Sequence, residues 1–208
     1  MFIVKLHKSV IVTYLGVMFG ICATYFAFVK MAFSQVSYLR YSLVFLVLAG
    51  ICDMFDGKIA RMCKRTEDEK NFGIQIDSLA DVVSFVFLPV VIMCSLGMTS
   101  VLDILVYCLF VICGISRLAY FNMIADSDVP VKYYSGLPVT STAIIYPILG
   151  LFHGVVSEGV FFKIYICATA LTAILFVLKI RVPKLKGIAY VIVPILSLIL
   201  ISLLLVLN

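Results

Sequence analysis

The sequence predicts an all-α polytopic membrane protein with about seven transmembrane helices. Of its 208 residues, 64% are hydrophobic and only 13% are charged. The mean hydropathy is +1.21. A soluble domain is nearer to half apolar and one quarter charged, so a water-soluble globule and a disordered chain are both excluded. The length leaves room for a single integral-membrane domain over 1–208 and for no fused soluble enzyme.

Seven long apolar runs are the predicted spans. They lie at roughly 10–29, 36–55, 75–96, 101–122, 138–156, 159–178 and 188–207. Each has about 20 residues, which crosses a ~30 Å hydrocarbon core at 1.5 Å per residue. The first run is too long for a signal-peptide core and lacks a small-x-small cleavage site. We therefore expect a retained helix, preceded by a cytoplasmic or interfacial segment over 1–9.

The distribution of Lys and Arg predicts the orientation. With the N-terminus inside, only Lys30, Arg40 and Lys163 of the 16 basic residues fall outside. Such a bias predicts a cytoplasmic N-terminus, an external C-terminus and a cytoplasmic active side. The formal net charge of +5 is thus explained by orientation, and no nucleic-acid partner is expected. The seven cysteines form no C-x-x-C pair and are expected to be free thiols.

Two kinds of acidic residue occur from the end of the second run to the start of the third. Glu67, Asp68 and Glu69 stand among basic residues, which is typical of a solvated loop. In contrast, four isolated aspartates flank the ends of the apolar runs. Asp53 and Asp56 share a helix face with Gly57 and Ala60, at i, i+3, i+4 and i+7. The other pair, Asp77 and Asp81, shares a face at i, i+4.

The four aspartates predict a site for divalent cations. Bare carboxylates at the membrane boundary cost several kcal/mol each unless they are paired or metal-bound. Oxygen ligands favour Mg²⁺, Mn²⁺ or Ca²⁺ over zinc or copper, and two such cations would clamp phosphoryl oxygens. Alternatively, aspartates near helix ends simply flank the membrane. That alternative explains one or two of them, but not two face-matched pairs with small residues on the same stripe.

These residues resemble a known signature. Asp53-x2-Asp56-Gly57-x2-Ala60-Arg61 followed by Gly73-x3-Asp77-x3-Asp81 is similar to the motif of the CDP-alcohol phosphatidyltransferase family. Eleven residues separate Arg61 from Gly73, where the common form has eight. The longer spacing resembles the phosphatidylserine synthase branch, as do the strings Arg117-Leu-Ala-Tyr-Phe-Asn122 and Ser135-Gly-Leu-Pro138. The resemblance spans roughly 10–180, and 188–207 would add one helix to a six-helix core.

The resemblance implies an activity and roles for the motif residues. The phosphatidyl group of CDP-diacylglycerol would be transferred to a hydroxyl acceptor, L-serine in this branch, with release of CMP. Asp53, Asp56, Asp77 and Asp81 would hold two Mg²⁺ or Mn²⁺ ions. Asp81 would also be the general base, and Gly57, Ala60, Arg61 and Gly73 would contact the CDP donor. A homodimer embedded among membrane lipids is also implied.

The acceptor site is predicted from weaker signals. Arg117 lies at the aspartate side and is expected to pair with serine's carboxylate or a donor phosphate, or else with a lipid phosphate. Asn122, Ser135 and Gly136 are further candidates, because Gly136 precedes a helix start with free N–H groups. The open alternatives are a sister transferase that uses glycerol phosphate, inositol phosphate or choline, and an ion-coupled transporter. Release of CMP distinguishes the transferases from the transporter.

Overall fold

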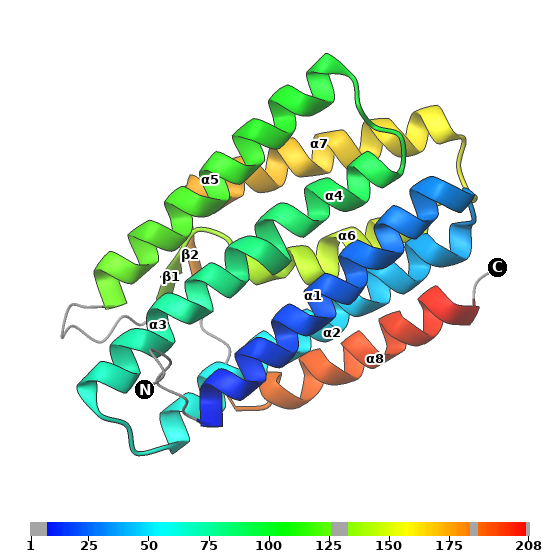
Figure 1. Ribbon diagram of the computed structural model, residues 1–208. Coiled ribbons are helices and arrows are strands. Elements are labelled where there is room, and N and C mark those ends of the chain that lie inside the picture. Colours follow the sequence, from blue (N-terminus) through cyan, green and yellow to red (C-terminus); the bar gives the residue numbers. More distant parts are fainter. Residues whose placement is uncertain (1–7, 126–132, 184–186, 207–208) are drawn as a thin grey trace.

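A computed structural model describes residues 8–125, 133–183 and 187–206 and shows an elongated bundle of helices (Figure 1). The elements in chain order are α1 (Lys8–Phe33), α2 (Val36–Met62), α3 (Glu67–Asp81), the π-helix η1 (Val82–Phe87), α4 (Leu88–Ser95), α5 (Val101–Ala125), β1 (Tyr133–Ser135), the 3₁₀-helix η2 (Val139–Ser141), α6 (Thr142–Gly150), α7 (Glu158–Val177), β2 (Arg181–Pro183) and α8 (Ala189–Val206). The predicted interfacial segment lies mostly outside these described residues.

The chain runs back and forth along the bundle, so that alternate connections gather at the same end. In Figure 1 the end of α2, the start of α3, the end of α5 and the start of α8 all lie at the end that carries the two strands. The aspartate motif and its basic neighbours therefore share one end of the molecule. This arrangement agrees with the predicted alternation of spans. Lys132, Lys184 and Lys186, which belong to the predicted basic side, lie outside the described residues.

Five helical segments of the described chain are long and apolar enough to cross a membrane. They are Val10–Phe33, Glu67–Ser95, Val101–Ile124, Glu158–Val177 and Ala189–Val206. The central helix α2 is 27 residues long, or about 40 Å at 1.5 Å per residue. These helices confirm the predicted all-α polytopic class.

The predicted run 138–156 is shorter in the structure. Its helical part, Val139–Gly150, ends where turns over 151–155 begin, and Gly154 there has a φ of +85°. Twelve helical residues rise about 18 Å, well short of a ~30 Å core. The prediction, which used hydropathy alone, extended the helix beyond Gly150 because the turn residues Leu151, Phe152 and Val155 are also apolar.

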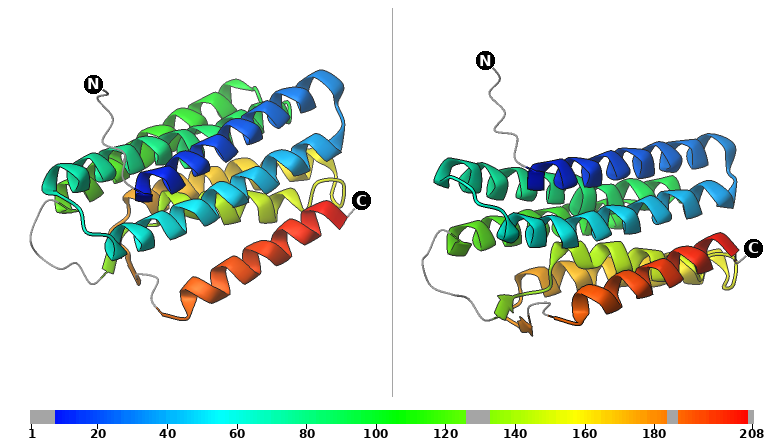
Figure 2. Two further views of the ribbon diagram at one scale, coloured as in Figure 1. Left: turned by 60° about the horizontal axis from the view of Figure 1, so that its bottom comes forward. Right: turned by 90° about the horizontal axis from the view of Figure 1, so that it is seen from below.

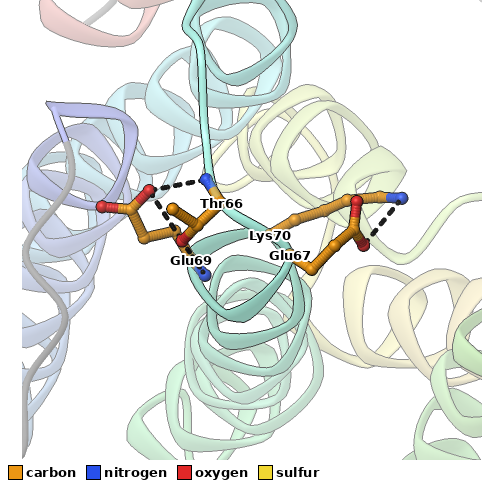
Figure 3. Close-up of polar contacts among 4 residues, drawn as sticks. All are labelled: Thr66, Glu67, Glu69 and Lys70. Carbon is orange, nitrogen blue, oxygen red and sulfur yellow. Dashed lines mark hydrogen bonds and ion pairs between the residues drawn. The ribbon is translucent and has the colours of Figure 1, made fainter.

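The third span begins earlier than its apolar run. Thr66 caps α3 reciprocally with Glu69, as Figure 3 shows: the Thr66 N–H donates to Glu69 Oε2 (2.8 Å), and the Glu69 N–H donates to Thr66 Oγ1 (3.3 Å). This capping box satisfies two backbone donors that the first turn would leave unpaired. Residues 67–74, which precede the predicted run, are therefore helical, and α3 continues through the π-turn η1 into α4.

The core is formed by buried side chains of α2, η1, α5, α6 and α7. Its fully buried side chains include Leu43 and Leu46 of α2, Phe110 of α5, Tyr146 of α6 and Tyr165 of α7. The buried hydroxyls are paired within this layer, since Tyr165 donates to the Tyr146 carbonyl (2.8 Å) and Tyr146 donates to Thr169 Oγ1 (3.1 Å). The last helix, α8, packs on α2 and α6 at one flank of the bundle (Figure 2).

Two three-residue strands, which the sequence did not predict, form a small ribbon beside the helices. β1 pairs antiparallel with β2, with Tyr134 opposite Val182. The ribbon ties the entry to α6 to the segment that leads from α7 to α8. Because three residues per strand leave the molecule overwhelmingly helical, the fold class is unchanged.

Candidate active site

Three of the predicted aspartates converge between the end of α2 and the middle of α3. One carboxylate oxygen each from Asp53, Asp56 and Asp77 lies within 4.8 Å of the others. Asp56 is 5% exposed, while Asp53 and Asp77 are half-buried. The helical spacing of each pair aims both side chains of a helix at the other helix, as the sequence predicts.

Asp81 lies next to this cluster, one turn further along the helix than Asp77. It is 8% exposed, and its carboxyl group makes a hydrogen-bonding contact with that of Asp53. It is not among the three residues whose oxygens share the 4.8 Å group. The structure therefore brings all four predicted aspartates together, with Asp81 as the inner neighbour of a three-carboxylate cluster.

A threonine of α1 supports the cluster. Thr13 Oγ1 donates a 2.8 Å hydrogen bond to Asp56 Oδ2, and both residues are buried. This contact fixes one oxygen of the Asp56 carboxylate, which lies beside those of Asp53 and Asp77. Sequence reasoning missed Thr13, because a single threonine in an apolar run shows no pattern that points to a helix 43 residues away.

A cavity of about 200 Å³ opens beside the cluster. All four predicted donor contacts line it, together with the two outer aspartates: Asp56, Gly57, Ala60, Arg61, Gly73 and Asp77. At Gly57 a side-chain Cβ would meet nothing within 4 Å, so this position faces open space. The stripe of small residues thus forms one wall of a cavity, as the sequence predicts.

Arg65 is a second arginine of this cavity, and sequence reasoning assigned it only to topology. It lines the same cavity as Arg61. Its Nη1 lies 3.3 Å from where a Cβ of Gly73 would stand, so the absence of a side chain at Gly73 leaves room for the guanidinium. Two guanidinium groups beside three carboxylates make a polar pocket that suits an anion held together with cations.

The predicted acceptor residues of α5 lie near the cluster. Arg117 is 8% exposed, its guanidinium lies 5.7 Å from the centre of the Phe121 ring, and its charge acts on the Asp53 carboxylate. Asn122 accepts a 2.9 Å hydrogen bond from Ser78 Oγ, which ties α5 to α3 between Asp77 and Asp81. The Oδ1 atom of Asn122 therefore holds α5 and α3 together.

The structure gives Gly136 a packing role. Its N–H donates to the Ile180 carbonyl (2.9 Å), its φ is +79°, and the Phe176 carbonyl occupies the place of a Cβ. Only glycine combines that backbone conformation with so close an approach. Ser135, its neighbour, pairs with Arg181 in the ribbon. The acceptor role predicted for both residues stays a prediction.

The donor set fits the predicted cation. Carboxylate oxygens are the ligands that Mg²⁺ and Mn²⁺ prefer, and the cluster offers them without a competing thiol or imidazole among the residues that form it. Three buried or half-buried carboxylates this close repel one another unless positive charge lies between them. Their arrangement is therefore consistent with a resident divalent cation.

Comparison with known proteins decides the family. The sequence model of the CDP-alcohol phosphatidyltransferase family matches residues 7–207. The chain belongs to this family. The match covers nearly the whole chain and includes α8 as well as the motif helices.

Individual members of the CDP-alcohol phosphatidyltransferase family show the same relationship. The chain is 32% identical over 154 residues to the CDP-diacylglycerol–serine O-phosphatidyltransferase of Saccharomyces cerevisiae, covering 64% of this chain and 54% of that protein. It is 32% identical over 158 residues to the enzyme of the same name from Helicobacter pylori (70% and 62%). It is 36% identical over 102 residues to the archaetidylserine synthase of Methanothermobacter thermautotrophicus (49% and 42%). The aligned part therefore spans between two fifths and two thirds of these relatives' length.

Proposed function

We propose that this membrane protein transfers the phosphatidyl group of CDP-diacylglycerol to the hydroxyl of L-serine and releases CMP. The observation that carries the proposal is the cavity between α2 and α3. It joins a stripe of small residues, two arginines and a carboxylate cluster at the end of a membrane-embedded bundle. The names of the three relatives, all of which mention serine, support the choice of acceptor.

The cavity matches the chemistry of the donor. CDP-diacylglycerol carries a pyrophosphate between a nucleoside and two lipid tails. Arg61 and Arg65 supply charge and hydrogen-bond donors for phosphate oxygens, and Gly57 and Ala60 let the nucleotide approach the backbone of α2. Because the cavity lies at the end of helices that cross the membrane, the tails can remain in lipid while the head enters the pocket.

Asp53, Asp56 and Asp77 are the residues that would hold divalent cations, with Asp81 as the fourth carboxylate. Bound Mg²⁺ or Mn²⁺ would neutralise charge on the pyrophosphate oxygens and on the departing phosphate. The protein itself orients the carboxylates, and the hydrogen bond from Thr13 orients that of Asp56. We propose two cations, as the resemblance implies.

The acceptor step needs a base and an orienting group. The serine hydroxyl oxygen attacks the phosphorus bonded to diacylglycerol, the bond from that phosphorus to the CMP oxygen breaks, and the hydroxyl proton passes to the Asp81 carboxylate. Asp81 suits this role because it is the innermost carboxylate and no imidazole lies among the residues that line the cavity. We assign Arg117 to the carboxylate of serine. The effect of its charge on the Asp53 carboxylate supports this assignment.

The proposal extends to orientation and assembly. The basic residues that surround the aspartate end, such as Lys58 and Lys64, favour a cytoplasmic active site under the positive-inside rule. A homodimer follows from the family resemblance, and its mass in detergent tests it.

An acceptor screen on the purified protein tests the function. CDP-diacylglycerol is supplied with Mn²⁺ or Mg²⁺, and CMP release is measured with serine, glycerol phosphate, inositol phosphate or choline. We expect release with serine. Release with another acceptor alone would reassign the chain to a sister transferase, and no release with any acceptor would favour the transporter.

The variant Arg117→Lys sharpens the choice of acceptor. Lysine keeps the charge but loses the fork that binds a carboxylate through two bonds. Losing a charge-assisted hydrogen bond of about 1.5–3 kcal/mol raises the KM for serine roughly ten- to a hundredfold. A rise in the KM for CDP-diacylglycerol instead would assign Arg117 to the donor phosphates.

A further inference from the structure

The first turn of α8 contacts the donor pocket. Arg61 Nη2 donates a 2.8 Å hydrogen bond to the hydroxyl oxygen of Tyr190. Arg61 lines the cavity described above, and Tyr190 lies 129 residues further along the chain. Helix α8 supplies none of the residues that line the cavity. Through Tyr190, however, it contacts Arg61, which does line the cavity.

A second contact holds the tyrosine ring in place. Lys58 Nζ lies over the face of the Tyr190 ring, 5.2 Å from its centre. Lys58 and Arg61 are one turn apart on α2, so they flank the same half-buried tyrosine. The ring binds one cation through its face while the hydroxyl accepts from the other.

The entry to α8 places Tyr190 at this position. Gly187 has a φ of +52°, and the Tyr190 N–H donates to its carbonyl (3.2 Å). The helix that follows packs along α2. The turn at 187–190 therefore fixes the tyrosine against the last two turns of α2.

We propose that Tyr190 is a positioning residue for the donor: it holds the Arg61 guanidinium in the orientation that binds the pyrophosphate of CDP-diacylglycerol. This inference rests on the proposed function and gives α8 a role in it. A long arginine side chain at an exposed position samples many rotamers, and fixing it beforehand reduces the entropy lost when the ligand binds. The contribution of Tyr190 thus belongs to donor affinity and not to the chemical step.

The variant Tyr190→Phe isolates the hydroxyl, because phenylalanine keeps the ring under Lys58. We expect its KM for CDP-diacylglycerol in mixed micelles to rise about two- to tenfold, the range for one ordinary hydrogen bond. The kcat and the KM for serine stay within twofold of wild type. Tyr25→Phe is the matched control, since Tyr25 is an exposed tyrosine of α1, and it should leave all three constants unchanged.

A double-mutant cycle tests the link to Arg61. The dissociation constant for CDP-diacylglycerol is measured with and without Tyr190→Phe, in the wild-type and in the Arg61→Met background. In the Arg61→Met background, Tyr190→Phe should change this constant less than twofold. An equal loss in both backgrounds would overturn the proposal, because Tyr190 would act without Arg61. So would an unchanged KM in Tyr190→Phe, or a lower kcat with a lower thermal midpoint. These outcomes require an active wild-type enzyme, whereas failure of the proposed function appears as wild-type protein that releases no CMP.

Discussion

Two groups of acidic residues lie within thirty positions of each other and behave in opposite ways. Asp53, Asp56 and Asp77 gather their oxygens within 4.8 Å in a partly buried cluster. Glu67 and Glu69 lie in the exposed first turn of α3, where Glu69 completes a capping box and Glu67 faces Lys70 at 3.7 Å (Figure 3). The same chemical group thus forms a candidate cation site in one place and caps a helix in the other.

The two groups have opposite effects on the stability of the fold. Carboxylates at the start of a helix interact favourably with its free N–H groups, so those of α3 stabilise the fold. Carboxylates crowded together out of water repel and destabilise it unless a cation lies between them. The buried group is therefore retained at a cost in stability, which indicates that its value lies in function. Substitutions should separate the two roles in both directions.

The largest effect is expected in the buried cluster. Asp77→Asn removes one charge and one ligand oxygen while keeping the shape, so we expect no detectable CMP release. EDTA should have the same effect on the wild-type protein, and Mn²⁺ or Mg²⁺ should restore turnover. In EDTA the thermal midpoint of Asp77→Asn should exceed that of wild type, because one repelling charge is gone.

Glu67→Gln is the matched control for this loss. It also neutralises one acidic residue of α3, but at an exposed position, and its turnover should equal that of wild type. Full turnover of Asp77→Asn, or of the wild-type protein stripped of metal, would show that the cluster is not a ligand site.

Substitution of Asp81, the inner carboxylate, should lower the rate of the chemical step without weakening donor binding. Asp81→Asn cannot accept the hydroxyl proton, and loss of a general base lowers kcat about 10²- to 10⁴-fold. The dissociation constant for CDP-diacylglycerol should change little, since Asp53, Asp56 and Asp77 still offer their oxygens. Turnover and donor binding are measured on the same preparation. Wild-type kcat in this variant would remove Asp81 from the mechanism.

A smaller effect is expected from the group that holds the cluster in place. Thr13→Val deletes the hydroxyl that donates to Asp56 while keeping the branched shape. Loss of such an outer partner lowers metal affinity or activity about 10- to 100-fold. We expect the Mn²⁺ concentration for half-maximal activity to rise by this factor. Thr24→Val is the control, because the Thr24 hydroxyl donates only to the Gly20 carbonyl of its own helix (3.0 Å). Equal effects of the two changes would assign Thr13 to packing of α1.

The clustering of the aspartates was predictable because it follows from helical spacing. Intervals of three and four residues put Asp53 with Asp56 and Asp77 with Asp81 on single faces, and a hairpin between adjacent spans brings the two faces together. The apolar runs predicted the spans for the same local reason. The end of the run 138–156 was wrong, since apolar residues in a turn look the same as those in a helix. The third span also began before its apolar run, at the capping box of α3.

The supporting residues were not predictable, because they meet through tertiary packing. Thr13 reaches Asp56 from another helix, and Tyr190 reaches Arg61 across most of the chain. Each is a single polar residue at an apolar segment and forms no local pattern. Arg65 was visible only as a positive charge, and its place in the cavity depends on the space left by Gly73. Sequence spacing predicts which side chains share one face of a helix. It does not predict which side chains of distant helices contact that face.

The smallest effect should come from the exposed group, and it should appear in stability alone. Thr66→Ala removes the side chain that accepts from the Glu69 N–H, and the loss of an N-cap costs about 1 kcal/mol. For a chain of this size that lowers the thermal midpoint by about 2–4 °C. The amides of the first turn of α3 should exchange faster with deuterium, whereas kcat and the KM for CDP-diacylglycerol stay at wild-type values below the transition. Glu67→Gln loses only an exposed pair worth about 0.2–0.5 kcal/mol and should lower the midpoint less. A large fall in kcat for Thr66→Ala at unchanged stability would mean that the start of α3 takes part in the reaction, and the two acidic groups would then no longer be separable.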